Sequence, residues 1–315
     1  MSEMGGNADM MGNRSAIDAV INTRISDHQS FIRAYPRPAD LSHHPLNILA
    51  DGDSWFDYPY GGPAPHLHSD ITRKLGGYRK LGGQLIDGSS ILNLAHFGNT
   101  AEELMKGRLR ERLATMMGDK ANGTFDAIMF SGGGNDLAGD QFEKWLRKYD
   151  DVGGDPEQGL DEDALQGVLT KVRDAYIDLI SLRNEIVPGV PIFVHGYDFA
   201  WPTGKRAFCA GPWLRPGLRT KGWDIGDEFQ VVQRGARIVA KMLGRFAIML
   251  EKLADDQNNN LVLIQTQALL DPQTEWANEL HPTPDGFARV AALFAEALTK
   301  KFPGRPVLAS QALNA

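Results

Sequence analysis

The sequence predicts an α/β protein with a three-layer α/β/α fold, in which helices cover both faces of a doubly wound, flavodoxin-like parallel sheet of five strands. Two observations lead to this prediction. Five short apolar runs show almost no polar alternation, which is typical of strands buried on both faces. Longer segments with apolar residues at helical spacing alternate with them. The runs are residues 46–50, 91–94, 127–130, 191–194 and 261–264, and the helical segments include 100–113, 162–185, 226–253 and 284–301.

The helical segment 226–253 has the clearest period. Its apolar residues recur at steps of three and four and form one stripe: Phe229, Val232, Ala236, Val239, Leu243, Phe246, Leu250 and Leu253. Such a stripe favours a helix that packs on the sheet. An oligomer-forming coiled coil is the other interpretation, and Gly235 and Gly244 disfavour it because glycine weakens a long free helix. The sequence still permits a homo-oligomer.

The chain is predicted to consist of a short tail and one domain. Residues 1–14 are polar and rich in Gly and Met, which predicts a disordered N-terminal tail. Residues 15–315 are predicted to form a single domain. Within it, residues 197–224 follow a strand end and are rich in Trp, Pro and Gly. Two interpretations of this insertion stay open: a loop folded against its own domain, or a lid or pocket wall.

Composition excludes several kinds of partner and site. The formal net charge is −7 and no run of Lys and Arg stands out, so nucleic acid is not expected as a partner. Cys209 is the only cysteine, which rules out an internal disulfide and a cysteine-rich zinc site. The N-terminus shows no secretory signal, and no stretch of about 18 apolar residues occurs. The sequence therefore predicts a cytoplasmic protein without a transmembrane segment.

Two predicted strands end in residues suited to chemistry. The first runs into residues 51–55 (Asp-Gly-Asp-Ser-Trp), which puts Ser54 at the carboxyl end of a strand, where ligands bind in such sheets. Asp and Ser are also favoured turn residues, so the tripeptide alone is weak evidence. The second strand is followed by Gly98, whose N–H could point at a ligand. Thr100 and Glu103 then predict a capping box for the next helix.

The third strand and the C-terminal region supply further polar groups. Glycines 132–134 precede Asn135 and Asp136, so backbone amides and the Asn135 side chain can approach a ligand. The glycine spacing fits neither the phosphate-binding loop nor the dinucleotide fingerprint, which disfavours a nucleotide. His281 lies between an amide and acid pair and two prolines. That setting suits a base held in one orientation.

Four other histidines raise the question of a metal site: His66, His68, His96 and His195. None of them lies four residues from another, and no cysteine accompanies them, so neither a metal nor an organic cofactor is expected. His195 lies near Tyr197 and Asp198 at a predicted strand end. It is predicted either to line a substrate pocket or to make a structural hydrogen bond.

Taken together, the four segments resemble the signature blocks of the SGNH hydrolases, the GDSL-type lipases and esterases, and they follow the same order along the chain. The resemblance spans residues 51–286 and covers the catalytic framework. It implies an α/β/α hydrolase in which Ser54 is the nucleophile and His281 the general base. It also implies that Gly98, Asn135 and the Ser54 N–H donate hydrogen bonds to the oxyanion.

One position departs from the family pattern. SGNH enzymes usually carry an aspartate three residues before the histidine, and here that residue is Asn278, with Glu279 after it. An amide can orient an imidazole, but it cannot stabilise an imidazolium as a carboxylate does. Three explanations are open: Asn278 orients His281, Glu279 or a more distant acid does so, or a backbone carbonyl near Trp276 supports a Ser-His dyad. We favour the first and third, because the Glu279 side chain should point elsewhere.

The predicted activity is hydrolysis of a small-molecule acyl ester through an acyl-enzyme intermediate. Asp53 and Asp136 are predicted to brace the catalytic loops rather than to transfer protons, and the aromatic residues of 197–224 predict an apolar acyl pocket. A non-catalytic ligand-binding protein that keeps the fold is the alternative from another class, motivated by Asn278. Within enzymes, a lipase, a thioesterase or a carbohydrate acetylesterase of the same fold is the alternative.

Overall fold

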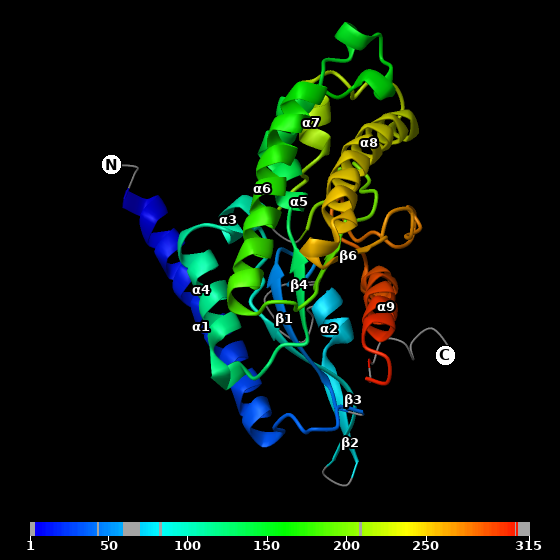
Figure 1. Ribbon diagram of the computed structural model, residues 1–315. Helices are drawn as coiled ribbons and strands as arrows, with labels where there is room; N and C mark the ends of the chain where they lie inside the picture. Colours follow the sequence, from blue (N-terminus) through cyan, green and yellow to red (C-terminus); the bar gives the residue numbers. More distant parts are fainter. Residues whose placement is uncertain are drawn as a thin grey trace.

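A mostly parallel sheet with helices on both faces forms the centre of the structure (Figure 1). The computed structural model describes residues 4–42, 44–58, 70–81, 84–207, 210–305 and 307. Three residues singled out above, His66, His68 and Cys209, lie outside these ranges. Within them, no helix has the length and apolar character needed to cross a membrane.

The elements have the following bounds. The strands are β1 (Leu46–Gly52), β2 (Gly77–Leu81), β3 (Gln84–Asn93), β4 (Ala127–Ser131), β5 (Ile192–His195) and β6 (Leu261–Ile264). The helices are α1 (Met4–Ala34), α2 (Ile71–Leu75), α3 (Ala101–Leu104), α4 (Gly107–Gly118), α5 (Gly134–Leu137), α6 (Glu162–Ile186), α7 (Arg215–Thr220), α8 (Glu228–Asp255) and α9 (Pro284–Lys301). Short 3₁₀ helices occur at Lys120–Asn122, Gly139–Trp145, Asp150–Val152, Pro156–Gln158 and Gln257–Asn259.

The sheet has the predicted flavodoxin-like strand order. Its strands run β2-β3-β1-β4-β5-β6, and the five from β3 to β6 are parallel, with Ile48 of β1 between Ile91 of β3 and Ala127 of β4. This confirms the predicted fold class. The edge strand β2 is additional and pairs antiparallel with β3. Strand β2 and the first half of β3 were not predicted from the sequence. The β3 strand begins at Gln84, and its first half contains polar residues and glycine instead of an apolar run.

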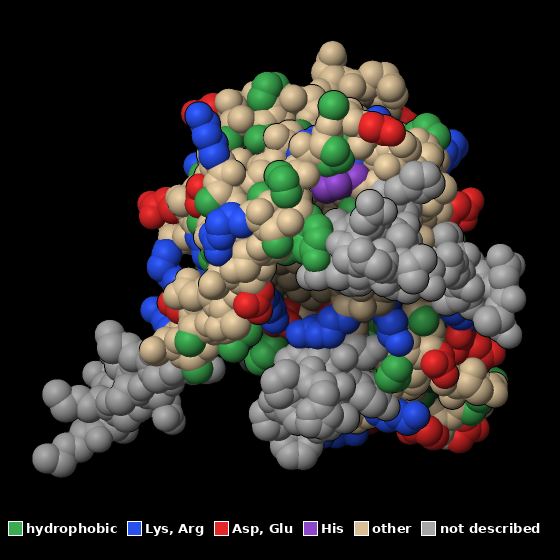
Figure 2. All heavy atoms as spheres, turned by 90° about the horizontal axis from the view of Figure 1, so that it is seen from below, with side chains coloured by type: hydrophobic (Ala, Val, Ile, Leu, Met, Phe, Trp, Pro, Cys, Tyr) green, Lys and Arg blue, Asp and Glu red, His purple; other side chains and the backbone are tan. Residues whose placement is uncertain are grey.

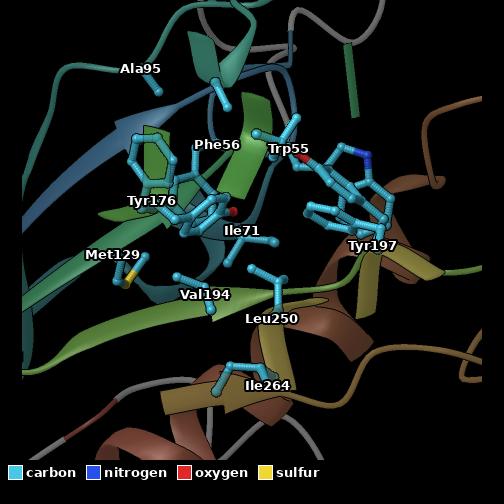
Figure 3. Close-up of a cluster of buried hydrophobic side chains, with 14 of the residues drawn as sticks. Trp55, Phe56, Ile71, Ala95, Met129, Tyr176, Val194, Tyr197, Leu250 and Ile264 are labelled. Atoms are coloured by element: carbon cyan, nitrogen blue, oxygen red, sulfur yellow. The ribbon is translucent and has the colours of Figure 1, made fainter. Parts of the chain in front are cut away.

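The helices divide between the two faces of the sheet. Figure 1 shows α4 and α6 on one side and α2 and α9 on the other. All residues of β1, β4 and β5 are buried, as expected for strands covered on both faces. Figure 3 shows side chains from several layers meeting in the core, among them Phe56, Ile71, Met129, Val194 and Leu250. The predicted helix 100–113 is broken into α3 and α4, and Gly107 at the start of α4 has a φ of +49°.

Helix α8 packs through most of its predicted stripe. Val239, Leu243, Phe246 and Leu250 are buried, so this face of α8 is used within the chain. The prediction is wrong at Phe229, which is 73% exposed. The buried face reaches the first turns through residues 235 and 231, four and eight positions before Val239, because a helix returns to the same face at steps of three to four residues.

Helix α1 was not predicted, and it overlaps residues 1–14, for which the disordered tail stays a prediction. The helix begins at Met4, so residues 4–14 are helical. Farther along α1, Ile21, His28 and Phe31 are buried at steps of seven and three, which places them on one face. Packing of this face on β3 stabilises the helix from its C-terminal half. The polar composition of residues 1–14 gives no indication of this buried face.

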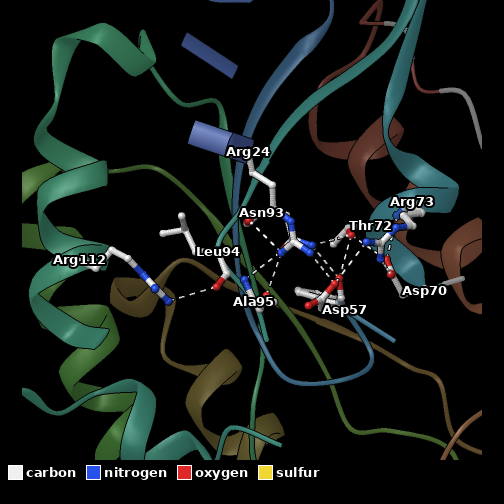
Figure 4. A network of polar contacts seen from close by, with 10 residues as sticks. Arg24, Asp57, Asp70, Thr72, Arg73, Asn93, Leu94, Ala95 and Arg112 are labelled. Atoms are coloured by element: carbon white, nitrogen blue, oxygen red, sulfur yellow. Dashed lines mark hydrogen bonds and ion pairs between the residues drawn. The ribbon is translucent and has the colours of Figure 1, made fainter. Parts of the chain in front are cut away.

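A polar network ties α1 to the turn that follows β1 (Figure 4). Arg24 donates to Asp57 Oδ1 at 2.6 Å and to the Ala95 carbonyl at 3.0 Å. Arg73 of α2 pairs with the same Asp57 oxygen at 3.3 Å. Asn93, at the end of β3, donates to the Phe56 carbonyl at 2.7 Å. These bonds come from three elements and fix the backbone three residues beyond Ser54.

The face seen from below in Figure 2 carries acidic and basic side chains side by side over its described part. This distribution is the one expected for 40 acidic and 33 basic residues without charge runs.

Candidate active site

Ser54 lies in a tight turn at the carboxyl end of β1. Gly52, the last residue of β1, has a φ of +153°, and a Cβ atom there would collide with the Ser131 carbonyl oxygen at the end of β4. The Asp53 N–H donates to the same carbonyl at 2.9 Å. Glycine is therefore required where β1 and β4 come close, and the chain turns at once to present Ser54, which is 6% exposed.

Asp53 is a buried acceptor for three donors. Its Oδ1 accepts from Ser131 Oγ at 2.7 Å and from the Trp55 N–H at 3.0 Å, and its Oδ2 accepts from the Tyr197 hydroxyl at 2.6 Å. Burial raises the pKa of Asp53 to about 6, and the three hydrogen bonds act in the opposite direction. These contacts connect the Ser54 turn to β4 and to the segment after β5.

His281 faces Ser54 from the loop before α9. Its Nε2 lies 2.7 Å from Ser54 Oγ, and its Nδ1 lies 2.9 Å from Asn278 Oδ1. A hairpin-like turn holds the ring in place, since the Ala277 N–H donates to the His281 carbonyl at 2.9 Å. The indole of Trp55 donates to the Leu280 carbonyl at 3.1 Å and so joins the two loops directly.

Backbone N–H groups determine which way the Asn278 amide points. Its Oδ1 accepts from the N–H groups of Leu280 at 3.0 Å and His281 at 3.1 Å, so it also faces His281 Nδ1, while Nδ2 donates to the Tyr58 hydroxyl at 2.7 Å. The Nδ1 atom then carries the proton, and Nε2 is the free acceptor that faces the Ser54 hydroxyl. The Tyr58 ring also stacks on the imidazole, with 4.1 Å between centroids and 12° between planes. The contacts thus match the first of the three explanations for Asn278.

Burial keeps His281 neutral. It lowers the pKa of His281 to about 3, so the imidazole is uncharged at neutral pH and Nε2 can accept a proton. Burial also lowers the pKa of His195 to about 3. His195 Nε2 lies 2.9 Å from Ser131 Oγ and its Nδ1 accepts from the Tyr197 N–H at 3.3 Å. These contacts are those of a structural hydrogen-bonding residue.

The glycine-rich turn after β4 lies close to the turn after β3. Asn135 Nδ2 donates to the Asn99 carbonyl at 2.8 Å. Asp136 accepts from the Ala101 N–H at 2.7 Å, at the start of α3. The predicted Thr100 capping box is confirmed in both directions. Within the described part of the chain, the N–H groups of Ser54 and Gly98 donate to no protein acceptor.

A pocket opens beside Ser54 and holds about 450 Å³ of empty space, part of it continuous with solvent. Asn135 lines it together with Ser54, whereas Gly98 does not. Its other walls are mainly apolar and include Leu137, Leu214, Val239, Met242, Leu243 and Leu280. The structure therefore brings Ser54, His281 and Asn278 into contact, places Asn135 in the same pocket, and puts Gly98 in the neighbouring turn.

Glu279 does not orient His281, which corrects that alternative. Its buried carboxylate accepts from four backbone N–H groups of the insertion: Gly204, Trp213, Leu214 and Arg215. The physical reason is the one expected, because adjacent side chains in this turn point in different directions. Trp213 lies edge-on to His281, with 5.5 Å between ring centroids. Tyr58 and Trp213 were not predicted from the sequence as neighbours of His281.

Among the described residues, no group of three or more His, Cys, Asp or Glu side chains could hold a metal ion.

The sequence and the structure were compared with known proteins. No protein-family model matches the sequence, and no curated protein matches it. The chain is similar in structure to a lipase from a goat rumen metagenome, at 16% identity and a TM-score of 0.49, over 80% of this chain and 97% of that one. It is also similar to an extracellular lipase from Streptomyces rimosus (16% identity, TM-score 0.44, 80% and 99%). A carbohydrate acetylesterase from Sinorhizobium meliloti is a third neighbour (13% identity, TM-score 0.45, 82% and 100%).

Proposed function

We propose that this chain is a serine ester hydrolase of the SGNH (GDSL-type) kind, with Ser54 as nucleophile and His281 as general base. The observation that carries the proposal is the 2.7 Å contact between Ser54 Oγ and His281 Nε2, with Nδ1 held by Asn278. A serine hydroxyl needs an adjacent base to become a nucleophile, and the base needs a third group to orient it. Two segments remote in sequence supply these groups, Ser54 from the first family block and Asn278 and His281 from the last.

The reaction follows from these contacts. His281 Nε2 takes the Ser54 proton as Oγ forms a bond to the acyl carbon, and the imidazolium then protonates the leaving alkoxide. A water molecule repeats the sequence on the acyl-enzyme, giving its proton to Nε2 and releasing the carboxylic acid. The neutral state of His281, which follows from its lowered pKa, is the state that the first proton transfer requires.

Three donors would stabilise the oxyanion that forms on the acyl carbonyl. The N–H groups of Ser54 and Gly98 are not engaged by the described part of the protein, and Asn135 keeps one N–H beyond its bond to Asn99. Loss of one such donor typically lowers kcat by about 10² to 10³. Asp53 and Asp136 would act as braces, since their contacts are to neighbouring backbone and hydroxyl groups.

The experiment that tests the proposal combines labelling and turnover. We expect a fluorophosphonate probe to label the wild-type protein once, and we expect p-nitrophenyl acetate to be hydrolysed. Ser54→Ala should abolish both, and His281→Ala should lower both by several orders of magnitude. Ser181→Ala, on the exposed outer face of α6, is the matched control. Equal turnover by wild type and Ser54→Ala would refute the assignment.

A ligand-binding protein that keeps the fold is the second candidate, and the amide at Asn278 is the observation that favours it, since a carboxylate is usual there. The same labelling experiment separates the two. A serine that stays unlabelled in a folded wild-type protein supports the binding protein, while stoichiometric labelling at Ser54 supports the hydrolase.

A further inference from the structure

We propose that Glu279 is a positioning residue that limits the enzyme to short acyl groups, by holding the start of α7 so that Leu214 forms a fixed part of the acyl-pocket wall. This inference rests on the proposed ester hydrolysis and names the substrate class: esters of short-chain acids. Glu279 acts through the segment it holds and not on the reacting atoms.

The anchor is a fully occupied buried carboxylate. Oε1 of Glu279 accepts from the Gly204 N–H at 2.9 Å and the Arg215 N–H at 3.1 Å, while Oε2 accepts from the Leu214 N–H at 2.8 Å and the Trp213 N–H at 2.5 Å. An ionised carboxylate offers about four acceptor positions, so all are used. Hydrogen bonds to an ionised acceptor are stronger than neutral ones, and the accepting residue, Glu279, is 0% exposed.

Three of these N–H groups lie at the start of α7. Groups at this position have no acceptor inside the helix, so they need one from elsewhere. Glu279 supplies it, and Leu214 has no side-chain cap of its own. The carboxylate therefore holds the start of α7 and, through its bond to the Gly204 N–H, a second point of the same insertion.

The held segment shapes the pocket next to the nucleophile. Leu214, 1% exposed, lines the same pocket as Ser54. The Trp213 ring contacts the His281 ring edge-on, with 76° between the two ring planes. Glu279 lies only two residues before His281, so the same turn carries the base and the carboxylate that holds Leu214. The position of Leu214 is therefore coupled to that of the Ser54 hydroxyl.

Helix α8 supplies another part of the pocket wall. Val239, Met242 and Leu243 belong to the long helix α8. Gly235 of this helix lets the insertion approach, since a Cβ there would lie 2.6 Å from Leu218 Cδ1 and 2.7 Å from Pro202 Cγ. An acyl chain that extends past Leu214 would have to displace one of two packed walls. In this proposal Leu214 therefore acts as part of a packed pocket wall.

A change at Glu279 should act locally. The guanidinium of Arg215 pairs with Asp224 at 2.6 Å and with Glu228 at 2.9 Å, independently of Glu279. These ion pairs hold α7 to the start of α8 when the carboxylate is replaced. In Glu279→Gln, the amide nitrogen cannot accept, so two of the four N–H groups lose their acceptor and Leu214 can move outward.

The test is a chain-length series. Rates are measured on p-nitrophenyl acetate, butyrate and octanoate for wild type, Glu279→Gln and Glu279→Asp. The matched control is Glu296→Gln, an exposed position on α9. We expect wild type to prefer acetate and butyrate. In Glu279→Gln the octanoate-to-acetate ratio of kcat/KM should rise about tenfold or more, the scale of discrimination by a single methylene in an apolar pocket. Glu279→Asp, which keeps the charge, should give a smaller rise.

Several results would overturn the inference. One is an unchanged octanoate-to-acetate ratio in folded Glu279→Gln. Another is an equal loss on all three esters, which would mean that Glu279 acts on the base. If Glu279→Gln does not fold, the ratio in Glu279→Asp decides by the same criterion. Leu214→Ala should raise the ratio by itself, and failure to do so also overturns the proposal. A wild type that is unlabelled by fluorophosphonate and inactive on every ester refutes the proposed function instead.

Discussion

Replacing Asn278 by aspartate puts a carboxylate where a neutral amide now holds the base. The oxygen that corresponds to Asn278 Oδ1 would stay 2.9 Å from His281 Nδ1, and the new oxygen would take the place of Nδ2. The Tyr58 hydroxyl, which now accepts from Asn278 Nδ2, can rotate and donate to the second carboxylate oxygen. The change therefore adds one negative charge beside the imidazole with little change in shape.

The expected size follows from electrostatics. Two unit charges about 4 Å apart interact by about 4 kcal/mol at an effective dielectric constant near 20. This corresponds to about three pKa units as an upper bound, because burying the new carboxylate has its own cost. We expect the pKa of His281, now lowered to about 3 by burial, to rise by about two units. The same interaction stabilises the imidazolium in the transition state, so kcat at pH 8 should rise about 10²-fold.

The assay is the pH profile of kcat/KM for p-nitrophenyl acetate between pH 4 and pH 8.5. The base must be unprotonated, so a lowered pKa keeps the wild-type rate flat as the pH falls through 6.5, the ordinary pKa of a histidine. In Asn278→Asp the raised pKa means that the rate falls as the pH drops below about 5. The advantage of the variant should therefore be largest at neutral pH and shrink toward pH 4.

The control is Asn184→Asp, which adds the same charge at an exposed position near the end of α6 and should leave the profile unchanged. A folded Asn278→Asp with the wild-type acidic limb and the wild-type kcat would refute the reasoning, since it would mean that Asn278 does not contact the base during turnover.

Two further predictions use the same site. Tyr58→Phe keeps the ring stacked on His281 but removes the hydroxyl that accepts from Asn278 Nδ2. In steady-state kinetics on p-nitrophenyl acetate, kcat should fall about tenfold while KM changes little. An unchanged kcat would mean that this hydroxyl does not help to hold Asn278. Asp53→Asn puts an amide donor among the three donors that now point at the carboxylate; the free energy of unfolding at pH 8 should fall by about 1–3 kcal/mol in urea titrations, and wild-type stability would argue against bracing.

Much of the framework could be predicted from local sequence. The five parallel strands were visible because strands buried on both faces must be apolar throughout, as in 127–130 and 261–264. The elements that were not predicted lack a continuous apolar run. Strand β2 lies at the edge of the sheet, and the first half of β3 is polar. Helix α1 did carry a signal at Ile21, His28 and Phe31, but a polar N-terminal composition obscured it.

The candidate site was predictable in its residue types and not in its contacts. Ser54 and His281 stood out because a hydroxyl and an imidazole follow or precede regular elements in recognisable turns. Nothing local indicates that Tyr58 contacts Asn278, since the two are 220 residues apart. The choice between Asn278 and Glu279 as partner of the histidine likewise depended on where each side chain points.

The sequence by itself determined the order of the five parallel strands and the identity of the groups at their ends, because burial pattern and turn chemistry are properties of short segments. Only the tertiary structure decided how those groups pair. Hydrogen bonds such as the one that Asn278 donates to Tyr58, and those that Glu279 accepts from Gly204 and Leu214, depend on distances between segments that are remote in the chain. Such distances are fixed by the packing of the whole core.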